Sequence, residues 1–148
     1  MWLPFYDVYI NKIESVLKQF TMFARKEYPS AANNYRITSY KQRLEALKMT
    51  TLHRRRINTS VTFIYDILNG NANCPTVCDD ITAGMPNRVL RRNEYIQIKD
   101  KNMKLALQSP VPHMCRQANL VPDLFTNSAS RESFTTSLQK LPDSIFGL

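Results

Sequence analysis

The apolar residues of the first part of the chain recur at helical intervals. Between positions 5 and 23 they lie three or four residues apart, at Tyr6, Tyr9, Ile10, Ile13, Val16, Leu17 and Phe20. Polar residues fill the other side, among them Lys12, Glu14 and Lys18. This pattern predicts a helix over residues 4–26 with its apolar side buried.

Two more helices are predicted in the first seventy residues. Ser39 is a suitable N-cap for the second helix, one side of which carries Tyr40, Leu44 and Leu47. Thr50-Thr51 precedes the third helix, which is expected to run to Leu68 and to stop at Asn69-Gly70 in a left-handed turn. The predicted buried side of the third helix consists of Ile57, Val61, Ile64, Tyr65 and Leu68.

Only short elements are predicted in the second half of the chain. A short helix is expected near residues 76–81, and residues 95–98 are β-favourable and predict a hairpin with residues 103–107. Ser-Pro-Val-Pro at residues 109–112 predicts an extended linker. Three short helices and a frayed end are expected to follow, the helices over residues 113–120, 122–125 and 130–138.

These elements predict a mainly α protein. A small bundle of three principal helices is expected over residues 1–70, and an irregular extension with short helices and a short β-hairpin over residues 71–148. With only three glycines in 148 residues, glycine-rich phosphate loops are not expected. The odd number of cysteines favours a reducing compartment, and no leader or membrane-spanning window is visible. We therefore expect an intracellular protein of the cytoplasm or nucleus, neither secreted nor bound to a membrane.

The positive charge is concentrated in one segment. The chain carries a net charge of +8, and residues 21–60 alone hold nine basic and two acidic side chains, a net +7. Such a concentration suits the binding of a polyanion. A solvated helical face whose charges pair within the molecule is an equally good interpretation.

Arg54-Arg55-Arg56 stands out because it lies at the start of the predicted third helix. The helix dipole disfavours a cation there by roughly 0.3–1 kcal/mol, so a carboxylate or a phosphate from outside the helix is expected to offset the penalty. Successive helical side chains point about 100° apart, so one arginine is expected to bind phosphate while another pairs with Glu14 or Glu45. The candidate phosphate-binding residues are Arg36, Lys41, Arg43, Arg54, Arg55 and Arg56.

Other candidate sites are rejected on their sequence context. Val77-Cys78-Asp79-Asp80 is close to the aromatic-x-Asp-Asp turn that holds two metal ions in polymerases, but Val77 replaces the aromatic residue and no flanking strand pair is evident. An acidic pair at a helix N-terminus is the simpler interpretation. Cys74 and Cys78 lack the paired spacing of a zinc site, and no nucleophile and histidine can be placed together. We therefore predict no catalytic residue, metal or cofactor in this chain.

Five short elements occur in order along the chain: Trp2-Leu3-Pro4-Phe5-Tyr6; Ile13-Glu14-Ser15-Val16 with Phe20-Thr21; Tyr40 to Leu47 (YKQRLEAL); Thr51 to Arg56 (TLHRRR); and Tyr65 to Gly70 (YDILNG). This series resembles the C-terminal region of reverse transcriptases from jockey-type non-LTR retrotransposons. Asn73-Cys74-Pro75 and weaker matches to the family's tail follow. Leu17 departs from the pattern, since the family usually has Gln there.

The resemblance implies the part of the enzyme that follows the palm, comprising thumb-like helices and a terminal extension. The metal-binding aspartates belong to the palm, which in the resembled enzymes uses Mg²⁺, so no activity is expected from this chain alone. Its implied partners are RNA, DNA or an RNA–DNA hybrid, together with the missing palm domain or another protein chain. The alternative is a helical protein-interaction module without nucleic-acid binding, which would dock a partner on the apolar side of the first helix. A stand-alone polymerase has only the rejected motif of residues 77–80 in its favour.

Overall fold

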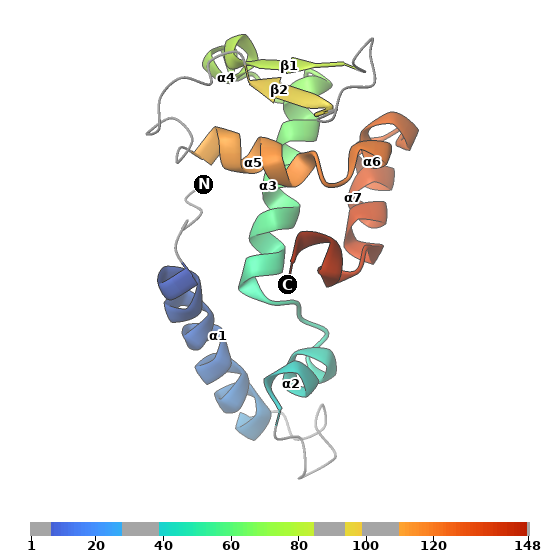
Figure 1. Cartoon of the computed structure of the whole chain (residues 1–148). Coiled ribbons are helices and arrows are strands. Elements are labelled where there is room, and N and C mark those ends of the chain that lie inside the picture. The colour runs from blue at the N-terminus through green and yellow to red at the C-terminus, as the bar shows by residue number, and fades with distance from the viewer. Residues whose placement is uncertain (1–6, 28–38, 85–93, 99–109, 148) are drawn as a thin grey trace. The chain divides into compact units, whose positions relative to one another are not determined.

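The computed structural model of the chain describes residues 7–27, 39–84, 94–98 and 110–147. Within these ranges the protein is mainly helical, with seven α-helices, one 3-10 helix and one two-stranded antiparallel sheet (Figure 1). The predicted mainly α class is therefore confirmed. None of the described helices combines the length and the apolar character needed to cross a bilayer.

The chain divides into two compact units. One is Leu3–Arg56, and the other is Ile57–Leu148 together with the first two residues. The division falls inside a helix, whereas the sequence suggested a boundary at Gly70. The reason is that the second half of this helix supplies Ile57, Val61 and Tyr65 to the core of the C-terminal unit.

The N-terminal unit contains α1 (Asp7–Glu27), α2 (Tyr40–Ala46) and the first turn of α3 (Leu52–Leu68). All three helices occur where the sequence predicts them. Ser39 is the N-cap of α2 as predicted, and its backbone N–H donates to Gln42 Oε1 over 3.4 Å in a capping box. Thr51 caps α3, since its hydroxyl oxygen accepts from the Arg54 backbone N–H over 3.1 Å.

The buried side of α1 differs from the prediction. Leu17 is buried as expected, but Val16 and Phe20 are exposed. Glu14, which belongs to the polar side of the sequence pattern, is buried instead, together with Thr21. The helix is therefore turned so that a partly polar face meets the rest of its unit, and the site described below gives the reason.

The C-terminal unit has a well-packed core although the sequence predicted an irregular extension. The second half of α3 packs against α6 (Pro122–Asn127), α7 (Arg131–Lys140) and η3 (Asp143–Phe146). The Tyr65 ring stacks on Phe134 with ring centroids 4.1 Å apart, and Phe125 meets Phe134 edge-on at 5.1 Å. Phe146 is buried, so the expected fraying of the last residues is wrong.

The sheet pairs different segments from those expected. Strand β2 (Ile96–Ile98) confirms the predicted strand, but its partner is β1 (Ile81–Ala83), which directly follows α4 (Pro75–Asp80). The expected partner, residues 103–107, lies outside the described residues. The Asn119 side chain completes β2, because Oδ1 accepts from the Ile96 N–H over 2.8 Å and Nδ2 donates to the Ile96 carbonyl over 2.9 Å.

Two local predictions in this unit are wrong. Helix α5 (Pro110–Ala118) begins inside the predicted extended linker, because its prolines occupy the first helical turn, where a missing N–H costs nothing. Asp79 and Asp80 lie at the C-terminal end of α4 rather than at a helix N-terminus. The C-terminal stop of α3 is confirmed, since Gly70 has φ +71° and donates its N–H to the Ile67 carbonyl.

Candidate functional site

The Glu14 carboxylate connects the three helices of the N-terminal unit. It lies on α1 with only 9% of its surface exposed. It accepts a hydrogen bond from the Tyr40 hydroxyl of α2, and Oε2 accepts from the backbone N–H groups of Leu52 over 3.1 Å and His53 over 3.4 Å. A side chain of α1 therefore caps the N-terminus of α3.

This cap explains why the arginine block is tolerated where it lies. The first N–H groups of a helix have no partner within the helix, and a negative charge beside them is favourable. The penalty expected for Arg54-Arg55-Arg56 at a helix start is thus offset by one carboxylate, which is one of the two kinds of group that the sequence suggested. The capping requirement also explains why the buried face of α1 carries Glu14.

Cationic side chains surround Tyr40 in the same unit. Lys18 Nζ lies 5.5 Å from the centre of its ring, and the guanidinium carbon of Arg43 lies 5.8 Å from it. Burial and the hydrogen bond and charge of Glu14 raise the pKa of the Tyr40 hydroxyl above its ordinary value, while the charges of Arg55 and Arg43 oppose this shift. Both arginines therefore lie close enough to act on this hydroxyl.

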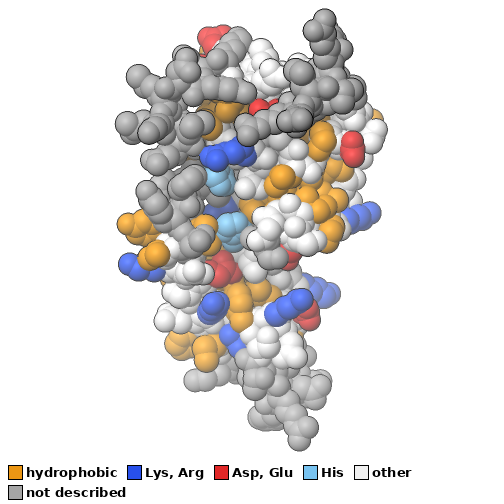
Figure 2. Space-filling model, in the orientation of Figure 1, with side chains coloured by type: hydrophobic (Ala, Val, Ile, Leu, Met, Phe, Trp, Pro, Cys, Tyr) orange, Lys and Arg blue, Asp and Glu red, His pale blue; other side chains and the backbone are white. Residues whose placement is uncertain are grey.

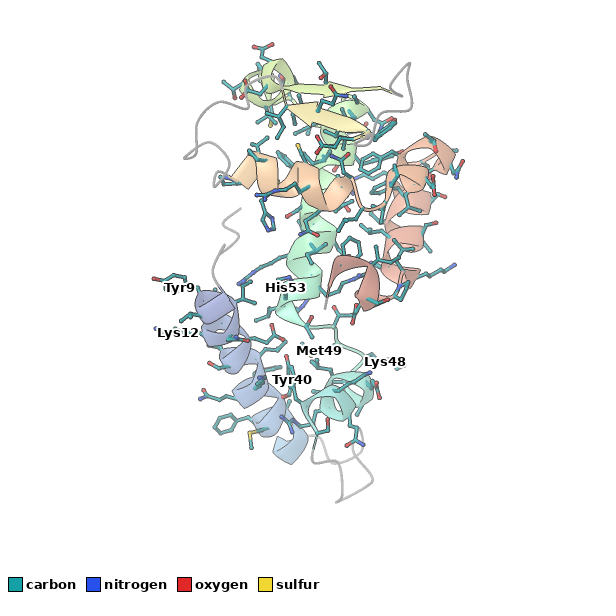
Figure 3. The ribbon with its side chains drawn as sticks, viewed as in Figure 1. Tyr9, Lys12, Tyr40, Lys48, Met49 and His53 are labelled. Carbon is teal, nitrogen blue, oxygen red and sulfur yellow. The ribbon has the colours of Figure 1, made fainter. Side chains whose placement is uncertain are left out.

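A hydroxyl group of α1 binds the Arg43 guanidinium. Its Nε donates to the Thr21 hydroxyl oxygen over 3.2 Å, and that hydroxyl in turn donates to the Lys18 carbonyl oxygen over 2.8 Å. Thr21 is fully buried. In Figure 3, Tyr40 points from α2 into the space between α1 and α2, while Tyr9 and Lys12 project from the other side of α1.

The structure separates the six predicted phosphate-binding residues. Arg54 is only 3% exposed and is therefore an internal side chain. Lys41 and Arg55 are exposed, and Arg43 and Arg56 are half-buried. Arg36 lies outside the described residues. The surface-accessible part of the predicted site therefore consists of side chains from α2 and the first turns of α3.

Sequence reasoning missed the roles of three residues at this site. Glu14 was considered as the partner of an arginine and not as the cap of a helix that starts 38 residues later. Lys18 was assigned to a polar face, and Tyr40 to helix packing with base stacking as the alternative. No local signal identifies these roles, because each depends on a contact between helices distant in the sequence.

The charge of the molecule follows its division into units. Residues 3–56 hold eleven basic and four acidic side chains, a net +7, whereas residues 57–148 hold nine and eight, a net +1. In the C-terminal unit Arg131 and Asp66 form an ion pair, with 2.9 Å between Nε and Oδ1. Whatever pairs form within the N-terminal unit, seven positive charges remain in excess.

Other reactive groups do not assemble into a site in the part of the chain that the structure describes. No three His, Cys, Asp or Glu side chains come together there as a potential metal site. Cys74, Cys78 and Cys115 are free thiols, and burial raises the pKa of Cys115 to about 11. The candidate functional site is therefore the group of charged side chains around Tyr40 and not these thiols and carboxylates.

No protein-family model, curated protein or solved structure matches this chain.

Proposed function

We propose that residues 3–56 bind nucleic acid through its phosphate backbone, as the thumb and C-terminal tail of a retrotransposon reverse transcriptase would. In this proposal the chain is a catalytically incomplete fragment of an RNA-directed DNA polymerase. It holds RNA, DNA or their hybrid without copying it, and the palm of such an enzyme would supply the Mg²⁺-dependent chemistry.

The observation that carries the proposal is the net +7 of a compact unit of 54 residues. A unit of this charge attracts polyanions and binds them with affinity that falls as salt rises. Of the acidic side chains described in this unit, Glu14 is already used by Tyr40 and by the N-terminus of α3. It is therefore poorly placed to neutralise the exposed lysines and arginines.

The arrangement of the cations supports backbone contacts rather than base reading. Exposed Lys41, Arg55 and Lys18 lie on three different helices of the unit, and arginine in particular binds phosphate through two parallel N–H groups. Contacts of this kind fix the position of a duplex without reading its sequence. The resemblance of the ordered sequence elements to those of retrotransposon enzymes favours a template-primer as the natural ligand.

Fluorescence anisotropy with a labelled RNA–DNA hybrid tests the proposal. We expect the logarithm of the association constant to fall linearly with the logarithm of salt concentration, with a slope proportional to the number of phosphate contacts. Replacing Arg55 or Lys41 by Gln should weaken binding and make the slope shallower by about one contact. Absence of binding at low salt, or binding that salt does not change, would refute the proposal.

Lys140→Gln is the matched control. Lys140 and Lys41 are both exposed lysines, but Lys140 lies in the nearly neutral C-terminal unit. The two variants therefore remove the same charge from different units. Equal losses of affinity would show that only the net charge of the chain matters and that the N-terminal unit is not the binding site.

A helical protein-interaction module is the second candidate function. It is favoured by the apolar side chains that α1 leaves exposed, among them Val16, Phe20 and Phe23. Anisotropy separates the two candidates, because an interaction module without a nucleic-acid role would give no salt-dependent binding.

A further inference from the structure

Three cationic side chains from three helices surround Tyr40. Lys18 of α1 and Arg43 of α2 lie 5.5 Å and 5.8 Å from the centre of its ring, measured from Nζ and from the guanidinium carbon. Arg55 comes from the first turn of α3, and its charge acts on the Tyr40 hydroxyl, whose pKa burial and Glu14 raise and both arginines lower. Lys18 and Arg55 are exposed and Arg43 is half-buried, so a ligand in solution can reach all three.

The Tyr40 ring attracts cations without neutralising them. The face of an aromatic ring is electrostatically negative, but the ring carries no net charge, so an anion nearby still meets the full charge of the ammonium or guanidinium group. The carboxylate at this site, Glu14, is buried and accepts hydrogen bonds from Tyr40 and from the Leu52 N–H. Glu45, an exposed acid of α2, lies about 140° around that helix from Tyr40. Three cations therefore face one carboxylate, and positive charge remains in excess.

One turn of α1 both carries Lys18 and orients Arg43. The Arg43 Nε donates to the Thr21 hydroxyl oxygen over 3.2 Å, and this hydroxyl donates to the Lys18 carbonyl oxygen over 2.8 Å. The bond to Thr21 uses one of the five N–H donors of the guanidinium group, whereas a bidentate contact with phosphate needs two. The position of this guanidinium group is thus fixed by the fold in a way that the position of an isolated surface arginine is not.

We infer that Lys18, Arg43 and Arg55 form one binding site for the phosphate groups of a nucleic-acid strand. The inference rests on the proposed function for its ligand, and it adds that the contacts are concentrated at Tyr40 rather than spread evenly over the charged unit. Guanidinium groups bind phosphate through paired N–H groups, and the ammonium group adds a point charge. Basic side chains accordingly lie on the surface of α1 and α2 in Figure 2. Tyr40 is a positioning residue in this site, because it holds the cations and does not itself contact the strand.

Lys12 provides a matched comparison with Lys18. Both are exposed lysines of α1, and Lys12 also lies beside a tyrosine, with its Nζ 5.9 Å from the centre of the Tyr9 ring. The helical rotation places the two lysines about 120° apart around α1. Figure 3 shows Tyr9 and Lys12 on the side of α1 that faces away from Tyr40. Replacing either lysine by Gln therefore removes the same charge from the same helix, but only one of the changes affects the site at Tyr40.

Anisotropy of the full chain with the labelled RNA–DNA hybrid, measured over a series of salt concentrations, tests the inference. Lys18→Gln should reduce the salt slope by about one and weaken binding about tenfold near 0.1 M salt, because one unit of slope is a factor of ten for each tenfold dilution from 1 M. Lys12→Gln should leave the slope unchanged and the affinity within about twofold, and so should Lys18→Arg, which keeps a cation at the site. Equal effects of the two Gln variants would overturn the inference and leave the proposed function standing. Absence of binding by the wild-type chain would refute both.

The tyrosine rings give a second measurement that does not depend on a substitution. When unlabelled hybrid is added, the NMR signals of the Tyr40 ring should shift and those of the Tyr9 ring should stay in place. Far-UV circular dichroism checks that the variants keep the helical content of the wild-type chain. Binding that shifts the Tyr9 ring, or that leaves the Tyr40 ring unchanged, would show that the phosphate groups bind elsewhere.

Discussion

Replacing Glu14 by Ala should destabilise the N-terminal unit more than any other substitution of an acidic residue there. The change removes the acceptor for the Tyr40 hydroxyl and for the N–H groups of Leu52 and His53. It also removes the negative charge at the N-terminus of α3. All three helices of the unit lose the group that connects them.

The magnitude follows from these contacts. A hydrogen bond to a charged group contributes about 1.5–3 kcal/mol, and a charge at a helix terminus about 0.3–1 kcal/mol. Because the three donors are only half-buried, water replaces part of what they lose, and removing a buried carboxylate recovers some desolvation energy. We therefore expect the free energy of unfolding to fall by about 2–4 kcal/mol, well short of the sum of the separate bonds. Glu14→Gln keeps one acceptor oxygen and should cost about half as much.

Denaturant unfolding followed by far-UV circular dichroism measures this loss, with Glu45→Ala as the control because Glu45 is an exposed acid on α2. Amide hydrogen exchange gives a residue-level measurement. The amides of Leu52 and His53 should lose protection in Glu14→Ala and keep it in Glu45→Ala. Equal stabilities of the two variants, or unchanged protection at Leu52 and His53, would refute the capping role.

Three further substitutions give independent tests. Burial and Glu14 raise the pKa of Tyr40, so the folded protein holds this proton more tightly than the unfolded chain does, and the resulting stabilisation is complete below about pH 10 and lost as the pH rises further. Tyr40→Phe should remove a component of the ultraviolet tyrosinate titration that ionises above the ordinary range of tyrosine, and an unchanged curve would contradict this. Asn119→Leu removes the amide that bonds the N–H and the carbonyl of buried Ile96, and the free energy of unfolding should fall by about 2–4 kcal/mol in thermal or chemical unfolding. An unchanged stability would show that β2 does not need this amide. Lys48 has φ +51°, a left-handed conformation that is strained for lysine and not for glycine, so Lys48→Gly should stabilise the protein by roughly 0.5–1 kcal/mol. A loss of stability would show that the contacts of the Lys48 side chain contribute more than the backbone strain costs.

Local sequence signals were enough to predict the helices of the N-terminal unit. Ser39 and Thr51 cap helices where they stand, and Gly70 ends α3 in the left-handed conformation that glycine adopts without cost. Each of these signals depends on residues a few positions apart. The same is true of Ser130, whose hydroxyl oxygen accepts from the Ser133 N–H at the start of α7.

The errors occur where distant residues decide the structure. Strand β1 has only three residues, and it pairs with β2. The sheet is completed by the side chain of Asn119, which lies 23 positions after Ile96 of β2. Phe146 belongs to the core because Tyr65 and Phe134 provide a surface for it, which no pattern in the last residues indicates. Periodicity identifies α1 as a helix but does not predict which face is buried, and the contacts of Glu14 with α2 and α3 decide it.

The role of Glu14 also changes how the arginine block should be interpreted. From the sequence, a run of three arginines at a helix start was expected to need a carboxylate or a phosphate from outside the helix, because the helix dipole disfavours cations there. The structure supplies a carboxylate from α1 at that position, and Arg54 is itself buried. The block therefore needs no phosphate in order to be tolerated. The proposal of polyanion binding depends instead on the seven positive charges that the N-terminal unit carries in excess. The exposed lysines of α1 and α2 contribute to this excess as much as the arginines do.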